Sequence, residues 1–416
     1  MIYHMAVYLY LGMIRLSSPF SAKARQWLAG RKGWRKAMEG AARQGPAGGE
    51  ALQTIWFHCA SLGEFEQGRP VIEDFRKQHP GWRILLTFFS PSGYRHRKDF
   101  PHADHVFYLP ADTPSNVRFF LDTWQPQAAV FVKYEYWYNY LDVLSRRGIP
   151  HIVISAIFRP GQYFFRPWGG WPRRQLARVT HFFVQDKESA RLLEGLGIRQ
   201  QVISGDTRFD RVHELARNQR DLPDIGSFAG DKPVLVAGST WPKDDGLLAG
   251  LLDGGKVEKL IVAPHETGPI RLDGMKAIYG DAVTLSDYLA GEGRNARVLL
   301  IDRIGILSRL YPYGKIAYIG GGFGQGIHNI LEAATYGVPV MFGPRHEKFA
   351  EARDLLKLGG AFCVSDRDSL AELSSALLSD ENKWRLASDA CRQYVEKQRG
   401  ATGRIMEWLS AQIVRT

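Results

Sequence analysis

The sequence has few cysteines. Cys59, Cys363 and Cys391 are its only thiols, and three scattered cysteines cannot complete a set of disulfides. Their spacing does not match a zinc site either. This cysteine usage excludes a disulfide-stapled secreted domain and indicates a reducing, cytosolic environment.

The sequence also lacks a long apolar run. Residues 5–13 (MAVYLYLGM) are apolar, but Arg15 and Ser17-Ser18-Pro19 follow at once, whereas a bilayer-spanning helix needs roughly 20 apolar residues. The segment has no charged leader and no small-residue cleavage site, which argues against a removed signal peptide. Two interpretations stay open: an interfacial anchor flanked by basic residues, or a helix packed on the body of the protein.

Motifs of several enzyme classes are absent. The sequence contains no G-x-x-x-x-G-K-[ST], no H-E-x-x-H, no nucleophilic serine elbow and no cluster of histidine or cysteine ligands. Asp366-Arg367-Asp368 matches the D-x-D pattern of metal-dependent transferases, but these residues fit better as the cap of the following helix. We therefore expect no metal site and no cofactor.

Acidic residues are too few to balance the basic ones, and the formal net charge is +11. This balance favours anionic partners such as nucleic acid, acidic lipid headgroups or phosphorylated substrates. One basic cluster comprises Arg15, Lys23, Arg25, Arg31, Lys32, Arg35 and Lys36, and another Arg159, Arg166, Arg173, Arg174 and Arg178. Because the clusters adjoin apolar or aromatic residues and no nucleic-acid-binding motif is present, we expect a membrane surface rather than nucleic acid.

Short apolar runs alternate with amphipathic segments in two series, which is the pattern of parallel βαβ units. The first series predicts strands at Ile55–Cys59, Ile84–Phe89, His105–Leu109, Ala128–Val132, His151–Ser155, Phe182–Val184 and Gln201–Ser204. The second predicts strands at Val234–Ala237, Leu260–Ala263, Val298–Ile301, Ile316–Ile319, Val338–Phe342 and Ala361–Val364. The runs are continuous, as in strands covered on both faces. The expected fold class is α/β, with two Rossmann-like, doubly wound lobes.

The polar residues 210–232 separate the two series and are expected to be a linker. Residues 1–40 would form a membrane-associating segment, residues 41–209 the first lobe, and residues 233–416 the second lobe with C-terminal helices. Two such lobes would leave a cleft at the carboxyl ends of both sheets, where ligands of these folds bind. This is the GT-B arrangement of glycosyltransferases, which some epimerases and phosphorylases share.

Three charged residues follow predicted strands of the first lobe. Glu64 begins a helix after the first strand, and Glu135 comes just after the fourth. Each acid alone could simply cap a helix, but two acids placed alike at strand ends of one sheet indicate a site. Arg208 follows the last strand and could face the cleft or pair with Asp206 or Asp210.

A glycine-rich loop marks the second lobe. Residues 320–333 (GGGFGQGIHNILEA) lie between a strand and a helix expected to start at His328-Asn329, where backbone N–H groups and the helix start would bind phosphate. No register fits G-x-G-x-x-G, so a dinucleotide fingerprint is not supported. Glu332 could accept from ribose hydroxyls, although a turn used only for packing is the alternative. His265, at another strand end, could be a polar core residue or a nucleotide contact.

In this order the segments resemble the Kdo transferases of Gram-negative bacteria, which move 3-deoxy-D-manno-octulosonic acid (Kdo) from CMP-Kdo onto the lipid A precursor. The matching segments span about Trp56 to Pro344, at the spacing of that family. They are Ala60-Ser61-Leu62-Gly63-Glu64, Glu135-Tyr136-Trp137-Tyr138-Asn139, Ser155 with Arg159, Gly205-Asp206-Thr207-Arg208-Phe209-Asp210, Pro264-His265, Ile304-Gly305 and His328-Asn329-Ile330-Leu331-Glu332.

The resemblance implies roles for the matching residues. Glu64 corresponds to the general base and Glu135 to an acid that assists the transition state. Arg208 stands where the family has lysine, which keeps the charge but changes its geometry. The implied CMP contacts are Pro264, His265, Ile304, Gly305, Ile306, Asn329, Ile330, Leu331 and Glu332. The family often has arginine in place of His265 and proline in place of Ile330.

The resemblance implies an inverting glycosyltransferase that needs no metal. Its partners would be CMP-Kdo, the lipid A precursor (lipid IVA) and the anionic inner-membrane surface, on whose cytoplasmic face it would serve lipopolysaccharide core biosynthesis. Two alternatives stay open. One is another GT-B nucleotide-sugar enzyme, such as a UDP-sugar transferase or an epimerase. The other is a basic, non-catalytic protein that binds membrane or nucleic acid.

Overall fold

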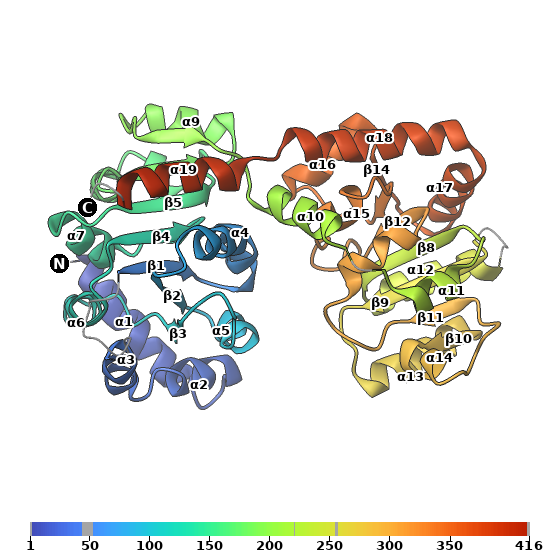
Figure 1. The fold of residues 1–416 in the computed structure, drawn as a ribbon, viewed down its shortest axis with the longest axis horizontal. Helices are drawn as coiled ribbons and strands as arrows, with labels where there is room; N and C mark the ends of the chain where they lie inside the picture. Colours follow the sequence, from blue (N-terminus) through green and yellow to red (C-terminus); the bar gives the residue numbers. More distant parts are fainter. Residues whose placement is uncertain (1, 44–52, 220, 254–256, 414–416) are drawn as a thin grey trace. The chain divides into compact units, whose positions relative to one another are not determined.

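The computed structural model describes residues 2–43, 53–219, 221–253 and 257–413. The chain divides into two compact units, Met1–Asp210 with Arg399–Thr416, and Arg211–Gln398. In the described residues each unit contains one parallel sheet of seven strands with helices between them (Figure 1). The predicted α/β class with two doubly wound lobes is therefore confirmed.

The sheet of the first unit has the strand order β3-β2-β1-β4-β5-β6-β7. Its strands are β1 (Thr54–Cys59), β2 (Arg83–Phe88), β3 (His105–Tyr108), β4 (Ala128–Val132), β5 (His151–Ala156), β6 (His181–Val184) and β7 (Gln201–Ile203). The order runs one way from β1 to β3 and the other way from β4 to β7. The strand order therefore reverses between β1 and β4, and ligands of doubly wound folds bind at such a point.

Helices cover both faces of this sheet. They are α4 (Leu62–Gln78), α5 (Pro91–Arg97), α6 (Pro114–Trp124), α7 (Tyr138–Arg146), α8 (Gly170–Leu176), α9 (Lys187–Glu194) and α19 (Ala401–Ile413), with the 3₁₀ turn η1 (Tyr163–Phe165). Residues of β1 alternate between the two cores: Trp56 belongs to one, whereas Ile55 and Phe57 belong to the other. This alternation follows from the period of two along a strand.

The sheet of the second unit has the order β10-β11-β9-β8-β12-β13-β14. Its strands are β8 (Val234–Thr240), β9 (Lys259–Pro264), β10 (Ala282–Thr284), β11 (Val298–Leu300), β12 (Ile316–Ile319), β13 (Val340–Phe342) and β14 (Ala361–Cys363). Here the strand order reverses between β8 and β12. The sequence pattern missed β10, since three residues between two helices are too few to show a strand period.

The second unit carries helices on both sides of its sheet. They are α11 (Pro223–Ala229), α12 (Pro242–Asp253), α13 (Pro269–Tyr279), α14 (Leu285–Leu289), α15 (Leu331–Ala334), α16 (Ala350–Leu358), α17 (Arg367–Ser379) and α18 (Glu381–Lys397), with the 3₁₀ turns η2 (Leu307–Arg309) and η3 (Tyr311–Tyr313). Buried Leu235, Val262 and Tyr318 form the centre of one core.

The division of the chain differs from the expected domain ranges in two respects. Residues 210–232, expected to be a linker, include most of α10 (Arg208–Arg217) and all of α11, and the boundary falls inside α10. The C-terminal helix α19, expected in the second lobe, belongs to the first unit. Ile405, Met406 and Leu409 of α19 are buried in the core that α4 also covers. The helix belongs to the first unit because its apolar face is buried there.

The N-terminal residues form α1 (Ile2–Ser17), α2 (Ala22–Ala29) and α3 (Trp34–Ala42). In the described residues, no helix combines the length and the apolar content that membrane crossing requires. One face of α1 packs on the first unit: Tyr3 donates to Asp112 at 2.5 Å. The ring of Tyr3 also lies 5.0 Å from Tyr138 and 5.6 Å from Trp171, measured between ring centroids.

The opposite face of α1 is apolar and exposed. Leu9, Met13 and Leu16 are 67%, 53% and 79% exposed, and Phe20 beyond the helix is 92% exposed. Spacings of three and four residues place them on one helical face. The basic residues Arg15, Lys23, Arg25, Lys32, Arg35 and Lys36 are exposed nearby in sequence. One face of α1 is therefore packed on the body of the protein, and the other face is apolar and exposed, as an interfacial anchor requires.

Candidate active site

Glu64 lies in the first turn of α4, directly after the carboxyl end of β1. Ser61 precedes the helix with extended backbone angles and donates its hydroxyl to Glu64 Oε2. The space beside the turn is open, because a Cβ atom added to Gly63 would meet only Ser61 Oγ, at 3.8 Å. The half-buried carboxylate is therefore held by its own turn and remains accessible.

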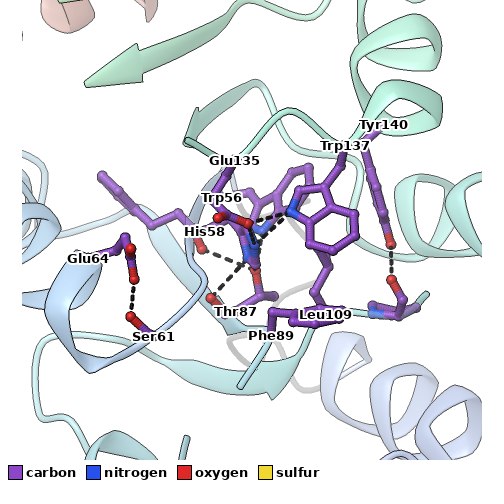
Figure 2. Close-up of polar contacts among 12 residues, drawn as sticks. Trp56, His58, Ser61, Glu64, Thr87, Phe89, Leu109, Glu135, Trp137 and Tyr140 are labelled. Atoms are coloured by element: carbon purple, nitrogen blue, oxygen red, sulfur yellow. Dashed lines mark hydrogen bonds and ion pairs between the residues drawn. The ribbon is translucent and has the colours of Figure 1, made fainter. Parts of the chain in front are cut away.

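Glu135 lies in the loop after β4, and its environment differs from the expected helix start. Helix α7 begins at Tyr138, so Glu135 precedes the helix instead of capping it. Lys133 has a φ of +69°, an uncommon conformation for a residue with a side chain, and this turns the chain after β4. Glu135 Oε2 accepts from Trp137 Nε1 at 2.7 Å and lies 3.2 Å from His58 Nε2 (Figure 2).

The two acids lie on either side of the point where strand order reverses. Strands β1 and β4 are hydrogen-bonded neighbours, with His58 paired to Phe131. Burial raises the pKa of the Cys59 thiol well above its usual value, and Glu64 and then Glu135 add to the shift. Both acids lie at strand ends of one sheet, as predicted, and the structure shows that the two strands are neighbours.

Arg208 lies at the start of α10 and forms a salt bridge with Asp206. Its Nη2 atom is 2.8 Å from Asp206 Oδ2, and its Nε atom donates to the same oxygen at 2.9 Å. Gln67 of α4 also donates to Asp206, at 3.0 Å. Burial raises the pKa of Asp206, but Arg208 and the hydrogen bonds outweigh burial and hold it below its usual value. Of the two expected positions of Arg208, the structure shows the pairing with Asp206.

Three rings stack at the carboxyl ends of β8 and β9 and in the loop after β12. The ring of His265 lies 4.6 Å from Trp241 and 4.7 Å from His328. Trp241 Nε1 lies 3.3 Å from His328 Nε2 and donates to it. Burial, with a smaller effect of His265, lowers the pKa of His328, so the neutral ring accepts the indole hydrogen at pH 7. His265, with an expected role in nucleotide contact, is thus part of an ordered stack.

These rings line a pocket of about 580 Å³. Its other lining residues are Pro242, Lys243, Asp244, Phe323, Gly324, Gln325 and Gly326. The volume falls within the range of small-ligand sites, roughly 300–1,000 Å³. Because β8 and β12 flank the reversal of strand order in this sheet, the pocket occupies the position at which doubly wound folds bind ligands.

The glycine-rich loop is built partly for packing. A Cβ atom at Gly320 would lie 2.3 Å from Ser239 O, and one at Gly322 would lie 2.5 Å from Gly343 N. The expected helix start at His328 is wrong: α15 begins at Leu331 and has four residues. A helix of one turn has a small dipole, so any anion here would depend on loop N–H groups and side chains.

The remaining expected CMP contacts lie in loops at the carboxyl edge of the same sheet. Pro264 ends β9, and the exposed Ile304 and Gly305, with Ile306 after them, follow β11. In the other expected segment, Asn329 Nδ2 donates to Glu332 Oε1 at 3.0 Å, and Asn329 Oδ1 accepts from Leu331 N at 3.2 Å. Ile330 and Leu331 are buried, so their side chains support the loop and only their backbone could face a ligand.

The D-x-D segment is a helix cap. Asp366 accepts from Ser369 N at 2.8 Å, and Ser369 Oγ accepts from Asp366 N at 3.1 Å, which completes a capping box at the start of α17. Within residues 2–43, 53–219, 221–253 and 257–413, no group of three His, Cys, Asp or Glu side chains could hold a metal ion.

Sequence analysis missed two supporting residues. His58 is fully buried in β1 and contacts Glu135; the signal was a histidine in an otherwise apolar strand. Asp244 is also buried: it accepts from Trp241 N at 2.9 Å, from Gly321 N at 3.0 Å and from Tyr318 OH at 2.7 Å. It therefore ties the turn after β8 to the glycine-rich loop, and no local motif indicated this.

Comparison with known proteins identifies the family. Residues 29–211 match the model of the family described as 3-deoxy-D-manno-octulosonic-acid transferase (kdotransferase). These residues carry a Kdo transferase domain. The Kdo transferase of Aquifex aeolicus is 28% identical over 78% of this chain and 86% of its own length. That of Haemophilus influenzae is 26% identical over 98% and 95% of the two chains. The predicted family, and with it a glycosyltransferase, is confirmed.

Solved structures agree on the fold. The UDP-GlcNAc 2-epimerase of Neisseria meningitidis, bound to UDP-GlcNAc, has a TM-score of 0.62 at 15% identity and covers 88% of this chain and all of its own. MurG of Acinetobacter baumannii has a TM-score of 0.55 at 14% identity and covers 86% of this chain and 99% of its own. At such identities the likeness shows the GT-B fold alone.

Proposed function

We propose that this chain moves Kdo from CMP-Kdo to the lipid A precursor with inversion at the anomeric carbon. The observation that carries the proposal is the pair Glu64 and Glu135 at neighbouring strand ends, on either side of the reversal of strand order. One of these acids is open to solvent, and the other is fixed by hydrogen bonds. That difference suits a base that moves a proton and an acid that holds a fixed position.

Glu64 acts as the general base. It takes the proton of an acceptor hydroxyl as that oxygen forms a bond to the anomeric carbon of Kdo. The bond from this carbon to the phosphate oxygen of CMP breaks, and CMP leaves with the bonding electron pair. A positioned base contributes roughly 10²–10⁴-fold to such a step. Glu135 and Arg208 stabilise the charges that develop, so the step needs no divalent metal.

The pocket of the second unit supports the donor side. Its aromatic and imidazole rings offer flat faces to a base or a sugar, and Lys243 and the loop N–H groups offer positive charge to a phosphate or a carboxylate. We assign CMP-Kdo to this pocket and to the adjoining residues Pro264, His265, Ile304–Ile306 and Asn329–Glu332. Burial lowers the pKa of His328, so the site depends on hydrogen bonding as well as charge.

The N-terminal helices support a lipid acceptor at a membrane surface. The exposed face of α1 would rest on the anionic inner membrane, with the exposed Trp168 and Arg166 of residues 158–171 beside it. An apolar pocket of about 220 Å³ lies beneath α1 and is lined in part by Tyr3, Val7, Leu11, Phe89 and Trp137. Since Trp137 contacts Glu135, this pocket brings apolar surface close to the proposed site. The protein would then work on the cytoplasmic face.

The test is a donor panel with the purified full chain and a lipid A precursor in detergent or vesicles. CMP-Kdo should give a product whose mass rises by one or more Kdo units, in the presence of a metal chelator. UDP-sugars, the donors of a rival GT-B enzyme, should give none. Product from a UDP-sugar, or none from CMP-Kdo, would overturn the proposal. Binding of duplex or single-stranded nucleic acid in its place would favour the non-catalytic alternative.

A further inference from the structure

A buried histidine lies directly behind Glu135. His58 belongs to β1 and has no solvent-exposed surface. Its Nε2 atom is 3.2 Å from Glu135 Oε2, whereas its Nδ1 atom is 3.1 Å from the carbonyl oxygen of Thr87 and 2.9 Å from the Thr87 hydroxyl. Figure 2 shows the imidazole between Thr87 on one side and Glu135 on the other.

The contacts with Thr87 fix which ring nitrogen faces Glu135. A carboxylate can only accept a hydrogen bond, so Nε2 must carry the ring hydrogen in order to hold Glu135, and Nδ1 is then an acceptor. The Thr87 hydroxyl supplies the matching donor: it lies 2.9 Å from Nδ1, it accepts from Trp56 Nε1 at 2.8 Å, and its hydrogen can point to Nδ1 or to Phe57 O at 3.3 Å. With Nδ1 engaged in this way, Nε2 is the only ring nitrogen left for the acid.

A second group meets the same carboxylate oxygen. Trp137 Nε1 donates to Glu135 Oε2 at 2.7 Å and lies 3.1 Å from His58 Nε2. Its ring packs against Phe89, with the centroids 4.8 Å apart. In the part of the chain that the structure describes, these contacts converge on Oε2, and no hydrogen bond to Oε1 is found. The Glu135 side chain is 13% exposed.

We propose that His58 and Trp137 are positioning residues for Glu135, and that they hold Oε2 so that Oε1 is presented to the sugar being transferred. This inference rests on the proposed function. A carboxylate on a loop has several rotamers, and only a fixed one stabilises a transition state without reorganisation. His58 holds the carboxylate from strand β1, and Trp137 holds it from the position just before α7. Both positions are well packed.

The test compares two replacements of His58, each of which places a side-chain amide where one of the two ring nitrogens was. In His58→Gln the amide nitrogen can occupy the place of Nε2 and donate to Glu135. In His58→Asn the amide occupies the place of Nδ1 and keeps only the contact with Thr87. We expect H58N to lower kcat by about 10–100-fold, as a misplaced group does, and H58Q to stay within a few-fold of the wild type. KM for CMP-Kdo should change little in both.

Two controls separate positioning from general stability. His151 is another buried histidine at the start of β5, and its Nδ1 contacts Ile149 O at 2.9 Å; H151N should disturb the core as H58N does but leave kcat close to the wild type. Trp137→Phe removes the indole N–H and should lower kcat. Trp124→Phe is its matched control, because Trp124 Nε1 is buried without a hydrogen-bond partner in the described residues.

A double-mutant cycle with Glu135→Ala decides the outcome. If His58 acts through Glu135, H58N and W137F should cost almost nothing further once the carboxylate is gone. Equal kcat losses in H58N and H58Q, or losses that add fully to that of E135A, would overturn the inference. If H58N does not fold, the cycles of H58Q and W137F with E135A decide in the same way. An inactive wild-type chain would instead count against the proposed function.

Discussion

Glu64 and Glu135 follow the neighbouring parallel strands β1 and β4, at the same edge of one sheet. They differ in what holds them. Glu64 is bonded to the hydroxyl of its own turn, whereas Glu135 is bonded to side chains from two other positions. A site with one accessible and one fixed carboxylate provides both a proton acceptor and a stationary charge, and the predictions below follow from this difference.

Replacing Glu64 should remove activity and leave the fold intact. We expect Glu64→Gln to lower kcat by roughly 10²–10⁴-fold with a thermal midpoint close to that of the wild type, because in the described residues the half-buried side chain is hydrogen-bonded to Ser61 of its own turn alone. Glu66→Gln is the matched control on the same helix: Glu66 pairs with Arg97 at 3.0 Å and points to a different partner. Near-normal turnover in E64Q would rule out this base.

Removing the cation beside Asp206 should destabilise the first unit in a pH-dependent way. Arg208→Met leaves a buried carboxylate without its partner, at a cost of roughly 3–5 kcal/mol at pH 7. Because the pKa of Asp206 is held below its usual value, the stabilisation exists above pH 4 and disappears as the pH falls below it. Thermal midpoints of wild type and R208M should therefore converge toward pH 3. A gap that stays constant with pH would contradict the pairing. Arg208→Lys, which keeps the charge, should retain more stability than R208M.

The contact between Tyr3 and Asp112 should make the docking of α1 depend on pH. Burial raises the pKa of Asp112 to about 6, although the Tyr3 hydroxyl partly opposes the shift. Between about pH 4 and pH 6, Asp112 is protonated in the folded chain but ionised in the unfolded chain. Its contribution to the free energy of unfolding therefore falls as the pH rises through that range. Above pH 6 the carboxylate needs the Tyr3 donor. Tyr3→Phe should therefore lower the thermal midpoint more at pH 8 than at pH 5.

Tyr8→Phe is the control for that experiment, since Tyr8 lies on the outer face of α1 and is 58% exposed. Its midpoint should follow the wild type at every pH. A hydrogen bond to a charged group contributes about 1.5–3 kcal/mol, which is large enough to resolve. An equal loss for Y3F at pH 5 and pH 8 would show that Asp112 does not change its charge there.

The apolar outer face of α1 should govern binding to anionic vesicles. Leu9→Glu removes a leucine whose burial in a membrane is worth roughly 1.5–3 kcal/mol, so flotation with phosphatidylglycerol vesicles should fall about tenfold or more. Leu386→Glu is the matched control: Leu386 is 70% exposed on α18 of the other unit. Equal flotation of the two variants would exclude α1 as the membrane-facing surface.

Local sequence predicted most of the sheets and the positions of the acids. Continuous apolar runs such as Ala128–Val132 appear as strands with the same bounds, because a strand covered on both faces needs an apolar residue at every position. The order of βαβ units also put Glu64 and Glu135 at carboxyl ends, since parallel strands all end at one edge. The glycine-rich loop was located correctly, but the start of the helix after it was not, since α15 begins at Leu331.

What the sequence determined by itself is the two-lobed class and the edge of each sheet at which charged side chains gather, because periodicity and chain direction are local properties. Tertiary structure alone decided the partners: Gln67 for Asp206, His58 for Glu135, and the first unit for α19. These pairings join residues far apart in the chain, and they form because buried charges and apolar faces need partners that only packing can supply.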